Sequence, residues 1–118
     1  MLSASTKSLI RYLNKSTGYR AGQTKPADAT SATKCLVVTR VGTDQGGTLL
    51  HGIDRPAFTV RCFAPTIGEA TDMADKVSAA MDRYRFEPHV TSCTEYSAYD
   101  DSGPNGPEYK LAYKITYR

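Results

Sequence analysis

The chain has 118 residues, of which 40% are hydrophobic and 23% are charged, so we expect one soluble globular domain over residues 1–118. It has no run of about 18 apolar residues, which excludes a membrane-spanning helix, and its first residues do not form the apolar stretch of a secretion signal. The net charge is +3 and the basic residues are scattered, a pattern that favours a solvated surface over a nucleic-acid-binding face.

The 3 cysteines, Cys35, Cys62 and Cys93, are widely separated in the sequence. An odd number without a C-x-x-C pair argues against a disulfide framework and against a zinc site. Each cysteine lies in a run that predicts a strand, where a free thiol behaves as a small buried hydrophobe. We therefore expect core thiols in a reducing cytoplasm.

The first predicted element is a helix over residues 5–15. Leu9, Ile10 and Leu13 fall at the i, i+1 and i+4 positions of one apolar stripe, and the basic residues around them mostly point away from it. Gly18 follows and predicts the C-terminal end of the helix. The domain therefore opens with one amphipathic helix.

A predicted strand follows between two loops. Residues 35–41 are rich in β-branched side chains and end at Gly42, which favours a strand over a buried helix. The polar residues 22–33 before it predict a loop, with the option of a short strand near residues 19–21 ahead of it. Residues 42–55 predict a long hairpin connection, and loops of this length are uncommon unless they have a function, such as contacting a partner.

A second strand and a second helix are predicted after Pro56. Along residues 57–64 the side chains alternate in character, which is typical of a sheet with one buried face. The two faces are Phe58, Val60 and Cys62 against Thr59, Arg61 and Phe63. Thr66 and Glu69 then form a capping-box pattern, in which each side chain bonds the backbone amide of the other residue. The expected core stripe of the helix is Ala70, Met73, Ala74, Val77 and Met81.

Two more strands are predicted after Pro88, which prevents the helix from continuing. They are residues 90–98 and 108–118, and the turn-forming residues 100–107 between them predict an antiparallel hairpin. The order of elements predicts an α+β fold, with a mostly antiparallel β-sheet and two α-helices packed on one face.

The 8 tyrosines contrast with the absence of tryptophan. Tyr109, Tyr113 and Tyr117 share one face of the last predicted strand with Leu111 and Ile115. This face fits a sheet core whose hydroxyls reach its rim, and it equally fits a protein interface, because tyrosine is enriched at protein contacts. Both interpretations stay open at this point.

The sequence contains no recognisable pattern for catalysis or for cofactor or metal binding. His51 and His89 lack a second ligand-type residue at metal spacing, and residues 42–47 have glycines without the GK[ST] of a phosphate loop. Asp100 and Asp101 lie in a predicted turn, where aspartate commonly makes local hydrogen bonds. We therefore predict that the protein is not an enzyme and that it binds no cofactor and no metal.

Segments of the chain resemble the tail-terminator, or tail-completion, proteins of siphophages. These segments are residues 35–42 (CLVVTRVG), residues 54–64 (DRPAFTVRCFA) and the helix that contains Glu69, Ala70, Ala74 and Val77. In that family a V-x-R-x-G strand is followed by a D-x-P strand ending in an aromatic–alanine pair, and then by a helix rich in A-x-x-x-A. The likeness extends over nearly the whole chain, although the loop after Arg40 is longer and residues 26–34 are more polar than in the family.

The resemblance implies a fold of helices against an antiparallel sheet and assembly as a hexameric ring on the last ring of tail-tube subunits. There the ring would stop tube growth and offer a docking surface to the head–tail connector of the neck. Genomic DNA would pass through the lumen without specific recognition. The implied partners are other copies of the chain, the tail-tube protein and the connector, in a virion assembled in the bacterial cytoplasm without a membrane.

We expect contacts between the subunits or with the tube in the predicted loop 42–55 and in the turn 99–108. The candidate contact residues are Gly46, Gly47, Leu49, Leu50, His51, Asp100 and Asp101. Two alternative functions remain open. One is another neck component, such as a head-closure or head–tail joining protein, and the other is a small α+β domain that binds nucleic acid or a ligand.

Overall fold

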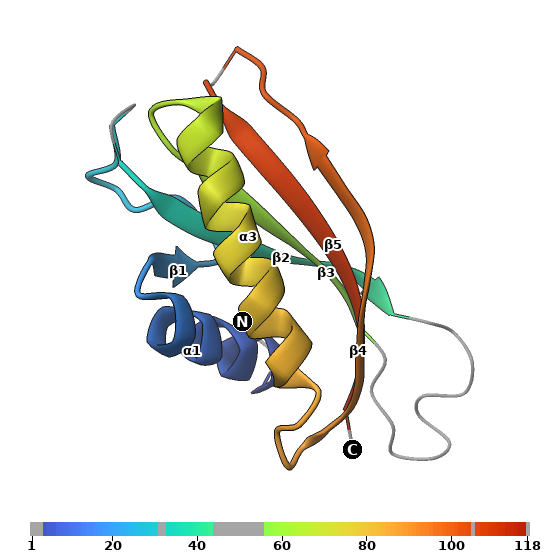
Figure 1. Cartoon of the computed structure of the whole chain (residues 1–118). Coiled ribbons are helices and arrows are strands. Elements are labelled where there is room, and N and C mark those ends of the chain that lie inside the picture. The colour runs from blue at the N-terminus through green and yellow to red at the C-terminus, as the bar shows by residue number, and fades with distance from the viewer. Residues whose placement is uncertain (1–3, 31–32, 44–55, 105, 118) are drawn as a thin grey trace.

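The computed structural model describes residues 4–30, 33–43, 56–104 and 106–117, which form two helices and one five-stranded sheet (Figure 1). The elements in chain order are α1 (Ala4–Thr17), β1 (Arg20–Gly22), β2 (Cys35–Thr43), β3 (Pro56–Phe63), α3 (Ile67–Tyr84), β4 (Val90–Asp100) and β5 (Glu108–Tyr117). The predicted α+β fold is confirmed. Neither helix is long and apolar enough to cross a bilayer, as far as the described residues go.

The sheet has the strand order β1-β2-β3-β5-β4. The short β1 pairs with β2 in parallel, and every other neighbouring pair is antiparallel. The predicted hairpin at the end of the chain is confirmed, because β4 and β5 pair from Val90 with Tyr117 to Asp100 with Tyr109. The antiparallel pairing of β2 with β3 also agrees with a hairpin, whose connection over residues 44–55 lies outside the described residues.

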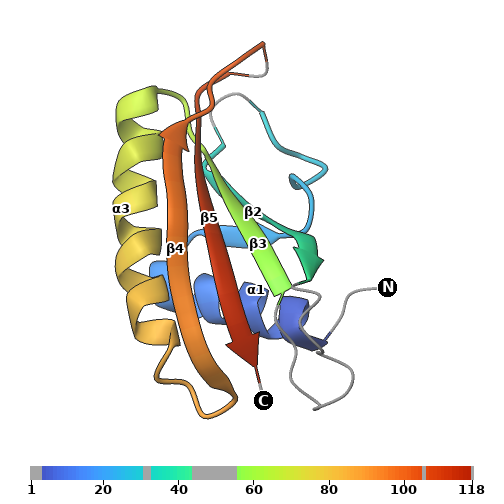
Figure 2. The same ribbon diagram turned by 90° about the vertical axis from the view of Figure 1, so that its right-hand side faces the viewer.

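Both helices pack on the same face of the sheet (Figures 1 and 2). α1 packs against β1 and β2, whereas α3 packs against β3, β5 and β4. Leu9 and Leu13 of α1 are fully buried in this layer. The predicted stripe of α3 is buried as well, together with Ala80 and Tyr84. Burial of a large apolar side chain contributes about 1.5–3 kcal/mol to folding, so this layer is the main source of stability.

The ends of the helices follow the local sequence. Gly18 has a φ of 77°, and its amide donates to the Asn14 carbonyl, as expected for a glycine that ends a helix. The Asn14 side chain accepts from the amide of Ala21 at 2.9 Å and donates to its carbonyl at 3.1 Å, which holds β1 beside the helix. At the start of α3, the Glu69 amide donates to Thr66 Oγ1 at 3.2 Å.

Of the two bonds in the predicted capping box, only the one from the Glu69 amide to Thr66 Oγ1 is present in the structure. The Thr66 hydroxyl donates to the Glu69 carboxylate at 3.3 Å, whereas the sequence predicted that this carboxylate would accept from the Thr66 backbone amide. The carboxylate also lies 3.7 Å from Lys34 Nζ. Two nearby partners therefore hold the Glu69 side chain away from the position that the pattern predicted.

The sheet face opposite the helices is more buried than the alternation of β3 predicted. Thr59, Phe63, Glu108 and Ala112 all point to that face and are each less than a tenth exposed. Part of the cover comes from the loop before β2, because Lys25 Nζ lies 4.0 Å from the centre of the Phe63 ring. The rest of this burial comes from neighbouring strands, because β3 and β5 each have a strand on both sides in the sheet.

The cysteines divide into two groups. Cys35 and Cys62 are buried, as predicted, whereas Cys93 on the edge strand β4 packs against the core but is only partly buried. All three thiols are free. An edge strand has a neighbour on one side only, which explains the partial exposure of Cys93.

Candidate interaction surface

The face of the sheet that points away from α1 and α3, which we call the outer face, has an exposed part over β3, β5 and β4. A row of side chains crosses it, since Arg61 of β3 is opposite Lys110 of β5, and Lys110 is opposite Tyr99 of β4. Lys114 and Tyr96 lie further along β5 and β4. The outer face therefore combines basic and aromatic side chains.

Tyr96 and Tyr99 are the exposed aromatic residues of this face, at 51% and 43% exposure. The Nζ atom of Lys114 lies 5.5 Å from the Tyr96 ring centre, and that of Lys110 lies 6.0 Å from the Tyr99 ring centre. A cation at this distance from a ring is weakly attracted to it. Each tyrosine is thus held beside a lysine while much of its ring stays open to a partner.

A bulge in β4 brings the two tyrosines to the same face. In a regular strand, residues three apart point to opposite faces. The β4–β5 register shifts between Glu95 and Ser97, so Tyr96 is itself the extra residue of β4, which the register with β5 leaves unpaired. Their neighbours Lys110 and Lys114 are an even number of residues apart on β5. Tyr96 and Tyr99 therefore stand on one surface, although the sequence pattern alone does not show it.

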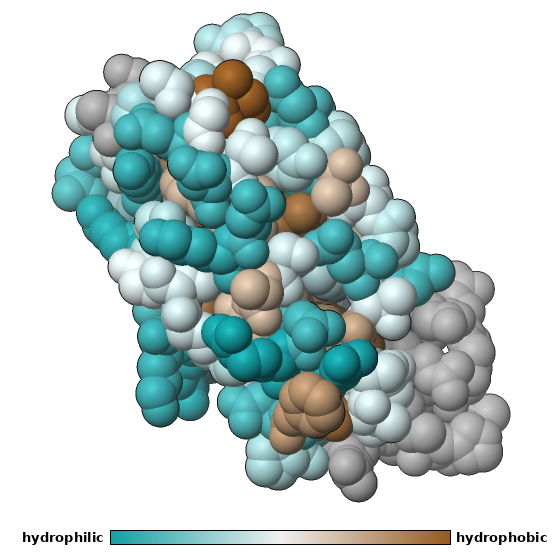
Figure 3. Space-filling view, viewed as in Figure 1, coloured by the Kyte–Doolittle hydropathy of each residue, from teal (hydrophilic) through white to brown (hydrophobic). Residues whose placement is uncertain are grey.

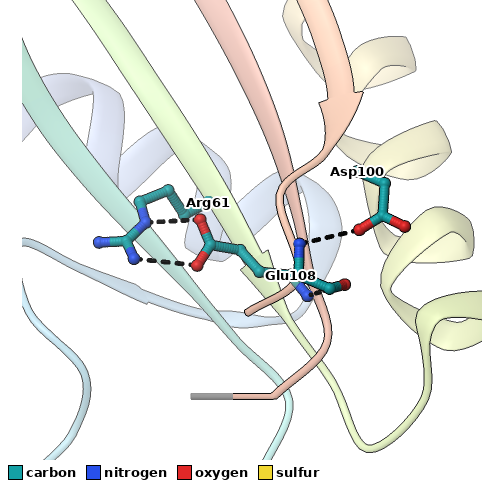
Figure 4. Close-up of polar contacts among 4 residues, drawn as sticks. Arg61, Asp100 and Glu108 are labelled. Atoms are coloured by element: carbon teal, nitrogen blue, oxygen red, sulfur yellow. Dashed lines mark hydrogen bonds and ion pairs between the residues drawn. The ribbon is translucent and has the colours of Figure 1, made fainter. Parts of the chain in front are cut away.

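Arg61 and Glu108 form the strongest polar contact of the outer face (Figure 4). Arg61 donates from Nε and Nη2 to the two carboxylate oxygens of Glu108, at 2.8 and 2.9 Å. The Glu108 side chain is only 6% exposed and that of Arg61 is 38% exposed. The bond to Glu108 raises the pKa of Arg61 above its ordinary value. This bidentate pair joins β3 to the beginning of β5.

The turn between β4 and β5 is held by local hydrogen bonds. The Ser102 amide donates to Asp100 Oδ1 at 2.9 Å (Figure 4), and the bonds from Ser102 lower the pKa of the exposed Asp100 carboxyl. The Asp101 amide donates to the Glu108 carbonyl at 2.9 Å, and Ser102 Oγ accepts from the Glu108 amide. Asp100 and Asp101 therefore act as turn residues beside the Arg61–Glu108 pair, and both stay exposed.

The other candidate contact residues, Gly46, Gly47, Leu49, Leu50 and His51, lie outside the described residues. Of the candidate contact residues that the structure describes, both aspartates lie near the outer face. Sequence reasoning included Tyr99 as the first residue of the predicted contact turn 99–108 but did not single out Tyr96, which the bulge in β4 brings to the same face.

The tyrosine face of β5 belongs to the core. Tyr113 and Tyr117 are 1% and 5% exposed, and Tyr109 is partly buried against the same core. Burial, followed by the hydrogen bond to Glu95, raises the pKa of Tyr113. Of the two interpretations of this face, the structure therefore supports the sheet core.

His89 and the thiols add no reactive group to the outer face. His89 is exposed in the segment before β4, where its Nε2 lies 2.8 Å from Ser8 Oγ and its ring stacks on Tyr117. Burial raises the pKa of Cys62 and of Cys93 to about 12, so both thiols stay protonated at neutral pH. Within the described ranges, no three His, Cys, Asp or Glu side chains group together so that they could hold a metal ion.

Comparison of the sequence with protein-family models and with curated proteins gives no match in either set.

Proposed function

We propose that this protein is a virion structural protein of a long-tailed bacteriophage, namely the tail terminator, and that it forms a hexameric ring at the end of the tail tube. Two things support the proposal. Segments of the sequence resemble tail terminators, and the fold has the helices and antiparallel sheet that this resemblance implies. The observation that carries the proposal is the exposure of Tyr96 and Tyr99 on the outer face. The main core lies on the other face of the sheet, against the helices, and does not include these two rings.

The outer face suits a contact with another protein. Tyrosine offers a rigid ring and a hydroxyl in one side chain, and it is enriched at the centres of interfaces. Lys110 and Lys114 beside the rings add charge, which directs the orientation of a partner more than it adds affinity. In the proposed ring, the outer face meets the last ring of tail-tube subunits and blocks the addition of further ones.

The test is a tube-capping assay with the tail-tube protein encoded in the same genome. We expect the purified chain to bind one end of preformed tubes and to stop their elongation, and negative-stain images to show rings. A chain that stays monomeric and leaves tube elongation unchanged would contradict the proposal. Binding to isolated heads without binding to tubes would assign the chain to the adjacent neck component instead.

A second candidate function, nucleic-acid binding, is favoured by the basic residues of the outer face. Lys110 and Lys114 lie beside tyrosine rings on which bases could stack, and Arg61 is opposite Lys110 in the sheet. Glu108, however, neutralises Arg61 directly. Binding of single- and double-stranded DNA over a series of salt concentrations separates the two functions. A steep loss of affinity with salt supports nucleic-acid binding, and weak binding without a preference supports the terminator.

A further inference from the structure

α1 carries a line of basic residues on its solvent side, which we call the basic stripe. Lys7, Arg11 and Lys15 stand at i, i+4 and i+8, so they follow one side of the helix for about 12 Å. All three are exposed, and none of them has an ion pair within the described part of the chain. The helix contains no acidic residue, so its positive charge is not balanced locally.

α3 carries an acidic stripe on its solvent side, bordered by the exposed basic residues Lys76 and Arg83. Asp72, Asp75, Ala79 and Asp82 stand at i, i+3, i+7 and i+10 and are all exposed, over a length of about 15 Å. Among the described residues Asp72 and Asp75 have no ion pair, and Asp82 has one long contact of 3.7 Å with Arg85. Ala79 leaves room for a neighbouring side chain in the middle of the stripe.

The two stripes belong to opposite halves of the helical layer. α1 covers β1 and β2, and α3 covers the half of the sheet that ends at β4. Asp82 borders a hollow that it shares with Cys93 and Glu95 of β4, so this end of the acidic stripe lies on the β4 side. On the flank of α3 nearer to α1, Lys76 Nζ lies 5.4 Å from the Tyr19 ring centre. The stripes of one chain are therefore placed to meet those of other copies.

We propose that the basic stripe of one copy docks on the acidic stripe of its neighbour, and that this contact closes the ring. The inference rests on the proposed ring-forming function and names the surfaces that build the ring. The two stripes match in length and are opposite in charge. Figure 3 shows the face that carries α3 as mostly hydrophilic with isolated apolar spots, which favours a charge-directed contact. A contact between two different surfaces repeats around an axis until it closes.

Two matched charge-reversal variants test the contact. Asp72→Lys/Asp75→Lys makes the acidic stripe basic, and Lys7→Glu/Arg11→Glu makes the basic stripe acidic. All four positions are exposed, so the core is kept. Each variant alone brings like charges together, and we expect its association constant to fall at least about tenfold.

A control variant makes the same change of net charge outside both stripes. Asp28→Lys/Glu87→Lys adds as much positive charge as the reversal of the acidic stripe does. Asp28 lies in the loop before β2 and Glu87 lies between α3 and β4. We expect this control to assemble like the wild type. Loss of assembly in the control would mean that net charge alone governs association, which would overturn the proposal.

The mixture of the two stripe variants gives the sharpest result. Each reversed stripe then meets a stripe of opposite charge on the other variant, so we expect alternating rings with the mass of the wild-type ring in light scattering. A single chain with all four reversals should also assemble. The inference is wrong if either variant alone forms normal rings, or if the mixture stays monomeric or stops at a two-fold heterodimer.

The inference and the proposed function can fail separately. If wild-type rings cap tubes and the stripe variants assemble normally, the function stands and these contact surfaces are wrong. If the wild-type chain forms no ring in solution or on tubes, both are wrong.

Discussion

The hydroxyl groups of Tyr84 and Tyr117 share a hydrogen bond of 2.9 Å inside the protein. Tyr84 is the last residue of α3 and Tyr117 is the last residue of β5, so one contact joins the end of the second helix to the end of the last strand. The rings meet edge to face, with their centres 6.2 Å apart. Burial raises the pKa of Tyr84, which keeps the hydroxyl neutral and able to donate.

We predict that Tyr84→Phe and Tyr117→Phe each lower the free energy of unfolding by about 1 kcal/mol, because each removes one buried hydrogen bond. The double variant should lose less than the sum of the two, since both changes remove the same bond. Urea denaturation of the wild type, both single variants and the double variant measures this coupling. Strict additivity would show that the two hydroxyls do not stabilise each other.

The Arg61–Glu108 pair predicts an asymmetry between its partners. Arg61→Ala leaves the buried Glu108 carboxylate without its bidentate donor. We expect the free energy of unfolding to fall by about 2–3 kcal/mol, which is less than for a fully buried pair because Arg61 is partly exposed. Glu108→Gln leaves a neutral side chain in the protein and a guanidinium that can reach water, so the free energy of unfolding should fall by only about 1 kcal/mol. Equal losses in urea denaturation would contradict this account.

Cys62 predicts a loss of stability at alkaline pH. Burial raises the pKa of its thiol from 9.0 to about 12, so between these values the unfolded chain releases a proton that the folded chain keeps. The free energy of unfolding is therefore unaffected below about pH 8 and falls by up to about 1.4 kcal/mol per pH unit above about pH 9. In Cys62→Ala, the free energy of unfolding should fall less steeply with pH than in the wild type, by this amount. Identical slopes in denaturation series of the two proteins would refute the assignment.

Much of the fold follows from local patterns in the sequence. The stripe of α3 with its N-terminal Thr66, the glycine that ends α1 and the alternation of β5 are all found as predicted, because each depends on side-chain periodicity or on one backbone conformation. The burial of Glu108 was not predicted, since it depends on a bidentate partner on another strand. A single sequence does not reveal such a pairing between distant segments.

The candidate surface was less predictable than the fold. The alternation rule assigns Tyr96 and Tyr99 to opposite faces of β4, and only the bulge at Tyr96 brings both to the outer face. Bulges depend on how a strand pairs with its neighbour, so they are invisible in hydrophobic periodicity. The same rule correctly placed Tyr113 and Tyr117 together, because the residues of β5 between them all pair in sequence with β4 and none is inserted.

The exposed tyrosines provide the last prediction, which concerns the proposed activity. Tyr96→Ala/Tyr99→Ala removes the aromatic area of the outer face, and exposed positions of an edge strand tolerate such a change with little loss of stability. We expect tube capping to weaken at least about tenfold, as for the loss of one interface hot spot, while ring formation in solution is unchanged. Phe86→Ala removes an aromatic ring that is 74% exposed between α3 and β4, and it serves as the matched control. Capping by the tyrosine variant at the wild-type concentration would show that the tube binds elsewhere on the protein.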